Sequence, residues 1–259
     1  MVLRVATLAA LLSTSLFAQA PATAPAKAPA KAAAKGALPA ARTLVDRHVK
    51  AIGGRAAILA HSSMHATGTL SMAGSGISGP IEVYGLAPDR VLVKASITGI
   101  GDIADGYDGE HAWSVNPMTG PTLKTGKEFE QTKLDADFYS ELRDPAKYTL
   151  TTIGRETFDG RECYKVSVKR VDGSEDFDFY DAATGLRAGS INTRETPMGT
   201  MTVSNTEGGY KKFGGLMQAT VLTQKVMGVE QKITLATVEY NTVNPSVFEP
   251  PAAIKALIK

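Results

Sequence analysis

Residues 161–181 read RECYKVSVKRVDGSEDFDFYD, and this stretch decides the fold. Two runs rich in Val, Tyr and Phe flank Asp172-Gly173, a dipeptide that favours a tight hairpin turn. A two-residue turn would pair Lys169 with Asp176, Val168 with Phe177, and Val166 with Phe179. The stretch therefore predicts an antiparallel hairpin with one charged face in solvent and one apolar, buried face.

The same pattern continues on both sides of this hairpin. A turn at Met227-Gly228 would pair Lys225 with Glu230 and Leu222 with Ile233, and a turn at Asp159-Gly160 would pair Ile153 with Val166. These pairings predict a continuous meander from about residue 147 to residue 243. Similar runs occur earlier in the chain, so we expect strands at 64–73, 79–87, 90–98, 102–108, 111–116, 147–157, 162–170, 175–181, 186–195, 200–213, 216–226 and 229–243.

Two segments have helical spacing instead. From Pro39 the apolar residues share one helical stripe up to Gly53-Gly54, and a short second helix follows over 55–60. Residues 126–143 are rich in helix formers, stop at Asp144-Pro145 and have two apolar stripes. Such a helix either fills the inside of the sheet and packs on the first helix, or acts as a lid over a cavity. The short tail over 252–259 is expected to pack on the sheet.

The N-terminus has the pattern of an export signal. Arg4, an apolar run and the small-x-small site Ala18-Gln19-Ala20 predict a cleavable secretory signal over residues 1–20. Residues 21–38 repeat Ala, Pro and Lys, which predicts a disordered linker, and 39–259 then form a single domain. The apolar run is too short for a transmembrane anchor, and no Cys follows it that could carry a lipid. We therefore expect a periplasmic protein without a transmembrane anchor in the mature chain.

Charge and cysteine content exclude several functions. The chain has 28 Lys and Arg against 26 Asp and Glu, but four of the cations precede residue 38, so the remainder has a net charge of −2. Nucleic acid is therefore not the expected partner, because phosphate binding needs an excess of cations on one face. Cys163 is the single cysteine, which rules out an internal disulfide.

The sequence contains no recognisable catalytic spacing, so we expect no enzyme activity, no metal and no cofactor. It does place Met118 and Met198 on loops rich in Pro and Gly. Methionine suits surfaces that accept variable apolar ligands, although these residues could equally fill the core from loops that fold inward. An enzyme built in the same cavity would need convergent polar groups, for which Glu82, Tyr84 and His111 are the candidates.

A series of motifs resembles a known family. In order they are AIGG (51–54), GISGPIEVYGLAPDRVLVKASITGIG (76–101), YDGEHAWSVNPMTGPTLK (107–124), GRECYKVSV (160–168), YDAATGL (180–186) and TPMGT (196–200). This order is similar to bacterial envelope proteins of the LolA/LolB-like superfamily, which are outer-membrane lipoprotein-sorting-like. The resemblance implies a mainly β (α+β) fold, an unclosed antiparallel β-barrel of about eleven strands whose covering helices enclose an apolar cavity for acyl chains.

Taken together, these features favour a non-catalytic periplasmic carrier of lipid or of the acyl chains of a lipoprotein. Its partners would be the lipid or acylated lipoprotein and a donor or acceptor protein at the inner or outer membrane. A structural or interaction module of the cell envelope is the alternative, and it would have a filled interior. The residues expected to line the cavity or its mouth are Ile81, Val83, Val93, Trp113, Met118, Phe138, Val166, Phe177, Phe179, Met198, Met201, Leu222 and Ile233.

Overall fold

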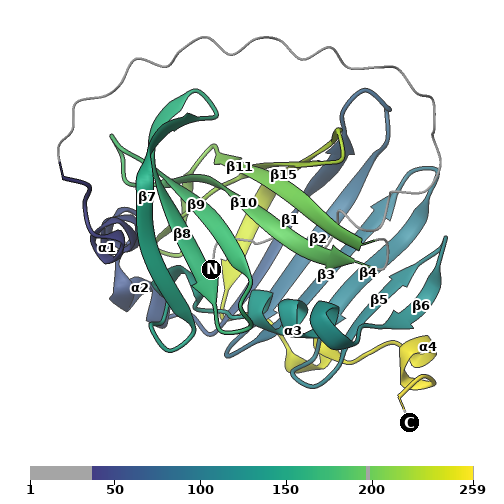
Figure 1. Cartoon of the computed structure of the whole chain (residues 1–259). Coiled ribbons are helices and arrows are strands. Elements are labelled where there is room, and N and C mark those ends of the chain that lie inside the picture. Colours follow the sequence, from purple (N-terminus) through teal and green to yellow (C-terminus); the bar gives the residue numbers. More distant parts are fainter. Residues whose placement is uncertain (1–36, 197–198, 259) are drawn as a thin grey trace.

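Thirteen antiparallel strands form one strongly curved sheet (Figure 1). The computed structural model describes residues 37–196 and 199–258. The N-terminal strands are β1 (Ser63–Met72), β2 (Ser78–Leu86), β3 (Arg90–Ile97), β4 (Gly101–Tyr107), β5 (Ala112–Asn116) and β6 (Gly120–Leu123). The C-terminal strands are β7 (Tyr148–Phe158), β8 (Arg161–Arg170), β9 (Glu175–Asp181), β10 (Arg187–Thr196), β11 (Gly199–Gly208), β14 (Val221–Val226) and β15 (Val229–Tyr240). The predicted export signal lies outside the described residues, as does the predicted linker except for its last two positions.

The order of the strands leaves the sheet unclosed. From one end to the other it is β6-β5-β4-β3-β2-β1-β15-β14-β11-β10-β9-β8-β7. The first strand of the chain therefore pairs with the last at the middle of the sheet, while β6 and β7 lie at opposite ends. The mainly β, unclosed antiparallel architecture is confirmed.

Each predicted strand segment contains a strand, but some boundaries differ. The segment predicted at 200–213 divides into β11 and β12 (Lys211–Phe213), because Gly209 has a φ of +60° that ends β11. The segment at 216–226 divides into β13 (Leu216–Gln218), which pairs with β12 in a separate small sheet, and β14. Strand β6 was not predicted, since it has four residues, one of them Pro121, and lies at the sheet edge.

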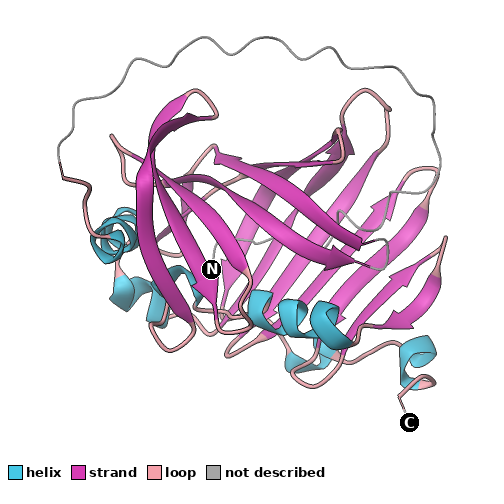
Figure 2. Cartoon of the chain, in the orientation of Figure 1, coloured by secondary structure: helices cyan, strands magenta, loops and turns pink. Residues whose placement is uncertain are grey.

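The helices are shorter than their sequence patterns predict (Figure 2). Of the helix predicted over 126–143, only the first ten residues are α-helical, and they form α3 (Gly126–Asp135). A 3₁₀ turn, η2 (Ser140–Leu142), follows. The chain leaves the helix because the Phe138 amide donates to the Pro88 carbonyl at 2.9 Å, which places Phe138 against the sheet. The other helical elements are α1 (Ala41–Ala51), α2 (Arg55–Leu59), η3 (Pro245–Phe248) and α4 (Ala252–Lys255).

Helix α3 bridges the two halves of the sheet on its open side (Figure 1). Phe129 and Ala136 pack against Tyr107 and Ala112 of the N-terminal half. On the other side, the Gln131 side chain accepts a hydrogen bond of 3.0 Å from the Glu195 amide of β10. Helix α3 therefore contacts both halves of the sheet, through apolar side chains on the N-terminal half and through a polar contact on the C-terminal half.

The hairpin that predicted the fold has a different register from the one expected. Lys169 pairs with Glu175 and Val166 pairs with Asp178, one residue away from the prediction. The loop contains three residues instead of two, because Gly173 has a φ of +84° and the Arg170 amide bonds to the Ser174 carbonyl at 2.9 Å. A shift of one residue exchanges the two faces of a strand, so Asp176 and Asp178 point to the side on which Phe177 and Phe179 were expected.

The other two predicted turns have different outcomes. At Met227-Gly228 the pairings of Lys225 with Glu230 and of Leu222 with Ile233 are confirmed. At the β7–β8 turn the ladder shifts between Thr152 and Gly154, so Val166 pairs with Thr152, and Ile153 is a bulged residue that is 51% exposed. The predicted pair of Ile153 and Val166 is therefore wrong, because a β-bulge changes which residues face each other.

Candidate functional site

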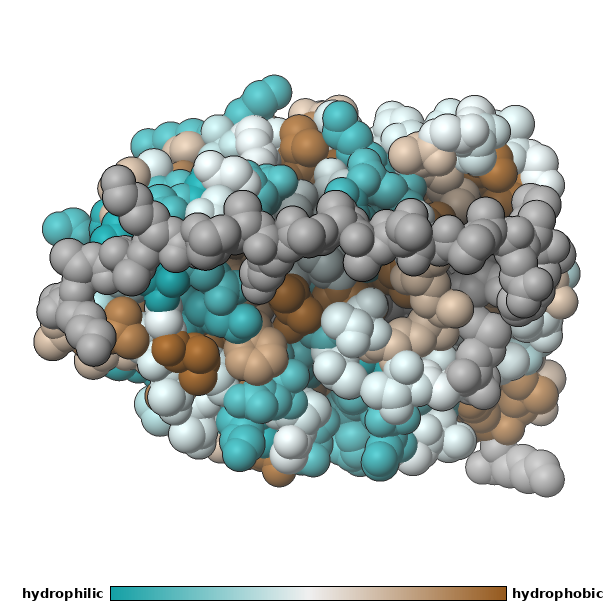
Figure 3. All heavy atoms as spheres, turned by 45° about the horizontal axis from the view of Figure 1, so that its top comes forward, coloured by the Kyte–Doolittle hydropathy of each residue, from teal (hydrophilic) through white to brown (hydrophobic). Residues whose placement is uncertain are grey.

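The sheet has an inner face, which we define as the face that contacts α1 and α3. On this face the central strands carry apolar side chains that pack together, and we call them the inner apolar cluster. Figure 3 shows hydrophobic side chains between hydrophilic rims on the side that looks into the hollow of the sheet. The buried members are Met64, Ala66, Leu70, Ile81, Val83, Val93, Ala95, Ile97, Ile103, Phe138, Ala219, Leu222, Ile233, Leu235 and Val238.

Many of the residues expected to line a cavity lie together on this face. Six of them, Ile81, Val83, Val93, Phe138, Leu222 and Ile233, belong to the inner apolar cluster. Val166 lies in a neighbouring cluster, where it packs with Leu44, Val45 and Val49 of α1. Met201 packs with Val203 and Val226 near the hairpin tips of β10–β11 and β14–β15.

Other residues expected near the cavity lie elsewhere. Trp113 is buried on the outer face, where it packs with Leu92, Phe248 and Ile254. Phe177 and Phe179 are also on the outer face, around Cys163, as the corrected register requires. Met118 is 51% exposed at the β5–β6 turn, and Met198 lies outside the described residues.

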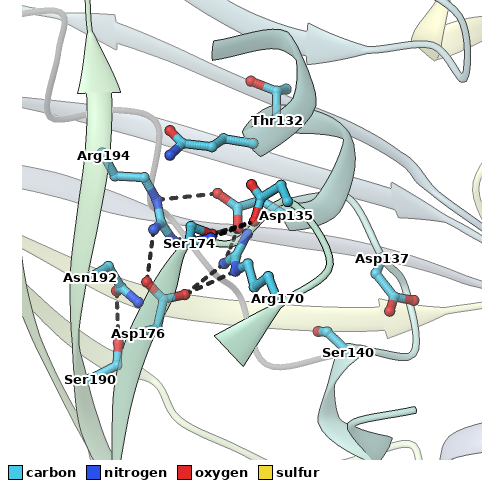
Figure 4. Close-up of polar contacts among 12 residues, drawn as sticks. Thr132, Asp135, Asp137, Ser140, Arg170, Ser174, Asp176, Ser190, Asn192 and Arg194 are labelled. Atoms are coloured by element: carbon cyan, nitrogen blue, oxygen red, sulfur yellow. Dashed lines mark hydrogen bonds and ion pairs between the residues drawn. The ribbon is translucent and has the colours of Figure 1, made fainter. Parts of the chain in front are cut away.

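A buried network of ion pairs lies on the inner face of the C-terminal half, and the sequence did not predict it. Asp176 accepts hydrogen bonds of 3.0 Å from Arg170 Nε and 3.0 Å from Arg194 Nη1. Asp135, at the end of α3, lies 2.6 Å from Arg170 Nη2 and 3.4 Å from Arg194 Nε (Figure 4). Two arginines and two aspartates thus neutralise each other and fix the end of α3 to β8, β9 and β10.

A second group of buried charges joins α1 to the sheet. Glu141 of the η2 turn accepts a hydrogen bond from His48 of α1 at 2.9 Å and lies 3.2 Å from Arg187 of β10. Arg187 Nε also donates to Glu207 of β11 at 2.8 Å. Burial raises the pKa of Glu141, but Arg187 and His48 lower it more, so the pKa lies well below its usual range. Glu141 is therefore a carboxylate held by charges from two other elements.

Arg143 and Asp178 extend this second group. Arg143 Nη2 and Asp178 Oδ2 form an ion pair in which both side chains are buried. Asp178 also accepts a hydrogen bond of 3.2 Å from the Tyr180 hydroxyl. Buried ion pairs add little net stability over an apolar core, but removal of one partner is costly. These charges therefore fix α1 and the η2 turn in one position on the sheet.

The only signal in the sequence for these networks is the alternation of Asp176 and Asp178 with Phe177 and Phe179. On its own it suggested a solvated strand face opposite Lys169. That prediction is wrong, because both aspartates are fully buried. Asp176 is paired with Arg194 of the neighbouring strand β10, and Asp178 is paired with Arg143, which follows the η2 turn.

A row of uncharged polar side chains crosses the inner face between apolar rows. Ser190, Asn205, Gln224 and Gln231 are consecutive cross-strand partners on β10, β11, β14 and β15. Gln224 Nε2 donates to Asn205 Oδ1 at 3.0 Å, and Asn205 Nδ2 donates to Asn192 Oδ1 at 2.7 Å. We call these five side chains the amide row; Figure 4 shows Ser190 and Asn192 beside Asp176 and Arg194.

The candidates for an enzyme do not form one site. Tyr84 donates a hydrogen bond to Glu82, and His65 stacks on the Tyr84 ring with 4.3 Å between the centroids. Burial, followed by the hydrogen bond to Glu82, raises the pKa of Tyr84 to about 12. Glu82 lines an outer cleft of about 490 Å³ with Lys94 and Asp102, whereas His111 lies 3.5 Å from Asp108 at the start of β5. The tyrosine is thus held protonated, which does not suit a general base.

Comparisons with known proteins find similar folds but no similar sequence. No family model matches the sequence, and no curated protein does so either.

In the part of the chain that the structure describes, no helix is both long and apolar enough to cross a membrane.

Three solved structures have similar folds. A LolA superfamily protein from Nitrosomonas europaea has a TM-score of 0.55 at 12% identity, over 82% of this chain and 99% of its own. A DUF1329 family protein from Desulfovibrio piger has a TM-score of 0.54 at 14% identity, over 81% and 97%. A domain described as an outer-membrane lipoprotein-sorting protein, from Vibrio parahaemolyticus, has a TM-score of 0.52 at 12% identity, over 81% and 96%. The chain therefore has the unclosed antiparallel fold of these LolA-superfamily and lipoprotein-sorting structures.

Proposed function

We propose that the protein is a non-catalytic periplasmic carrier that holds acyl chains of a lipid or lipoprotein against the inner apolar cluster. The observation that carries the proposal is the position of this cluster. Its members come from β1–β4, β14 and β15, while α3 packs mainly on β5 and β10. Phe138 is the one buried member that does not come from the sheet or from the turn before β14, so the sheet itself supplies almost all of the apolar surface that the proposal uses.

Transfer energies give the scale of the binding free energy that an acyl chain gains on an apolar surface. Each methylene group removed from water contributes about 0.8 kcal/mol. Burial of about a dozen methylenes therefore gives about 10 kcal/mol before the costs of association. Release then requires a competing acceptor or a change in the position of α3, the element that bridges the two halves of the sheet.

The first test is to isolate the full chain from a bacterial envelope fraction and to analyse it by native mass spectrometry and lipid extraction. We expect a bound lipid, and we expect the delipidated protein to bind a fluorescent fatty acid. Absence of both would overturn the carrier proposal and would favour an interaction module of the envelope.

A pair of variants assigns the binding to the inner face. Leu222 belongs to the inner apolar cluster and is 9% exposed, so Leu222→Gln should weaken binding of the fluorescent fatty acid about tenfold. Val171 is 65% exposed at the β8–β9 turn, and Val171→Gln is the matched control that should leave binding unchanged. Equal binding by both folded variants would place the ligand elsewhere.

A further inference from the structure

Four hairpin turns lie side by side at one end of the sheet, and we call them the uncharged rim. They join strands that are consecutive neighbours in the sheet, and their residues are 227–228, 73–77, 98–100 and 117–119 (Figure 1). The Ala73 amide donates to the Glu230 carbonyl at 3.0 Å, which ties the β1–β2 turn to the start of β15. Pro117 Cγ lies so close to Gly101 that a Cβ atom there would be 3.2 Å away. The four turns therefore form one border of the curved sheet.

The uncharged rim differs in charge from the opposite end of the same strands. None of its residues is charged, whereas the β2–β3 and β4–β5 turns at the other end contain Asp89, Asp108 and Glu110. The charged residues within two positions of the rim are Lys225, Glu230 and Asp102. Lys225 is paired with Glu230 at 3.1 Å, and Asp102 accepts a hydrogen bond from Ser96. The rim therefore offers a charged partner little electrostatic attraction.

The rim exposes large apolar side chains instead. Met227 is 75% exposed, Val229 directly after the same turn is 44% exposed, and Met118 is about half exposed. Met227 also has a φ of +50°, at a position of a two-residue turn that favours Asn, Asp or Gly. An apolar side chain that lies in water on an unfavourable backbone conformation gains nothing from folding. A contact outside the chain explains its presence.

The exposed turns are continuous with the apolar inner face. Ile77 of the β1–β2 turn and Ile100 of the β3–β4 turn are partly buried and pack against the inner apolar cluster. Val226, which precedes Met227, packs with Val203 of the neighbouring strand β11. Apolar side chains therefore run from the tips of the turns to the inside of the sheet.

We propose that the uncharged rim docks on a lipid bilayer whose head groups carry no net charge, with Met118, Met227 and Val229 inserted below the head groups. Docking of this kind depends on buried apolar area and on attraction to anionic lipids, and the rim supplies the first of these. Flexible methionines on separate turns suit a fluid surface, because lipids rearrange around each side chain, whereas a folded partner needs a packed pocket for it. The inference goes beyond the proposed carrier function and requires no ligand on the inner face.

The test measures binding of the exported full-length protein, after delipidation, to vesicles of phosphatidylcholine and phosphatidylethanolamine by co-sedimentation. We expect binding that high salt does not weaken, because the rim contributes no ion pair to it. Absence of binding to these vesicles would overturn the inference. Binding that requires anionic phosphatidylglycerol and disappears at high salt would also overturn it, and would assign the contact to cations such as Lys27, Lys31 and Lys35.

Substitutions of Met227 assign the contact to the rim. Met227→Asn should raise the lipid concentration for half-maximal binding about tenfold, because it removes an inserted apolar side chain. Asn tolerates a positive φ, so urea unfolding should show a stability equal to that of the wild type or greater. Met227→Leu retains an apolar side chain and should retain vesicle binding. Val171→Asn is the matched control, since Val171 is equally exposed in the turn that contains Asp172. Equal binding by Met227→Asn and wild type would overturn the assignment.

A second copy of the chain is the other candidate occupant of the rim. Sedimentation velocity of the wild type and of Met227→Asn, both without lipid, distinguishes it from a bilayer. Monomers in both cases, together with the loss of vesicle binding by the variant, support the proposal. A wild-type dimer that Met227→Asn dissociates would overturn it and would make the rim an interface between two copies.

Discussion

Glu141 Oε1 and Arg187 Nη2 lie 3.2 Å apart in the protein interior, and each side chain is 1% exposed. This pair joins the η2 turn to β10, and His48 extends the connection to α1. We expect Glu141→Gln to lower the free energy of unfolding by about 3–5 kcal/mol, because it leaves a buried arginine with one partner fewer. Urea unfolding measures the change. Glu230→Gln removes the exposed partner of Lys225 and should cost less than about 1 kcal/mol.

The contribution of Glu141 should depend on pH in a defined direction. Its pKa in the folded protein lies well below its usual range, whereas in the unfolded chain it is about 4.3. A depressed folded pKa gives stability that is present above the unfolded pKa and is lost as the pH falls through the folded pKa. The difference in unfolding free energy between wild type and Glu141→Gln should therefore be constant near neutral pH and shrink below about pH 4. An unchanged difference at pH 3 would contradict the assignment.

The corrected register of the β8–β9 hairpin gives a direct mutational test. Asp176 is fully buried between Arg170 and Arg194, so Asp176→Asn should destabilise the protein by about 3–5 kcal/mol. Glu175, the next residue, is exposed, and Glu175→Gln should change the stability by less than about 1 kcal/mol. A change of less than about 1 kcal/mol for Asp176→Asn would contradict its buried position and would favour the register of a two-residue turn. Urea unfolding of both variants decides between the registers.

Trp113 should report on the C-terminal segment instead of the ligand. It is the single tryptophan of the chain, and it lies on the outer face against Phe248 and Ile254. Ile254→Asp should shift the tryptophan emission to longer wavelength, because it exposes the indole to water. A fluorescent fatty acid bound on the inner face should leave the emission maximum unchanged. A large ligand-induced shift would place the binding site on the outer face.

Cys163 should be unreactive while the protein is folded. Its side chain is fully buried, and burial raises the pKa of the thiol to about 11. Because the thiolate is the reactive form, a disulfide reagent at pH 8 should modify it only as fast as the protein opens. Rapid labelling in buffer without denaturant would contradict the buried position. Addition of urea provides the positive control.

The sequence was informative where a local pattern decides the structure. Alternation located the strands, and the Met227-Gly228 turn fixed a correct register because both residues adopt positive φ. The Asp172-Gly173 turn gave the wrong register, since a glycine with positive φ suits loops of two or three residues equally. One residue of error then reversed the faces of Asp176 and Phe177.

The candidate site depended on contacts that the sequence does not record. Asp176 and Arg194 are 18 residues apart, and Asp135 and Arg194 are 59 residues apart, so no local pattern brings them together. The sequence pattern places Trp113 correctly on a strand, but such a pattern does not tell which face of the sheet is the inner face. The amide row was missed for the same reason, because Ser190, Asn205, Gln224 and Gln231 align only once four strands are paired.

The open seam between β6 and β7 has a mechanical consequence. In a closed barrel, the number of strands and their stagger fix the radius. Here the described sheet has two ends, so it can flatten or tighten by a change of twist without breaking a ladder of hydrogen bonds between strands. Helix α3 instead connects the two halves of the sheet, through its contacts to β5 and β10. The width of the hollow on the inner face should therefore depend on the contacts that one ten-residue helix makes with the two halves of the sheet.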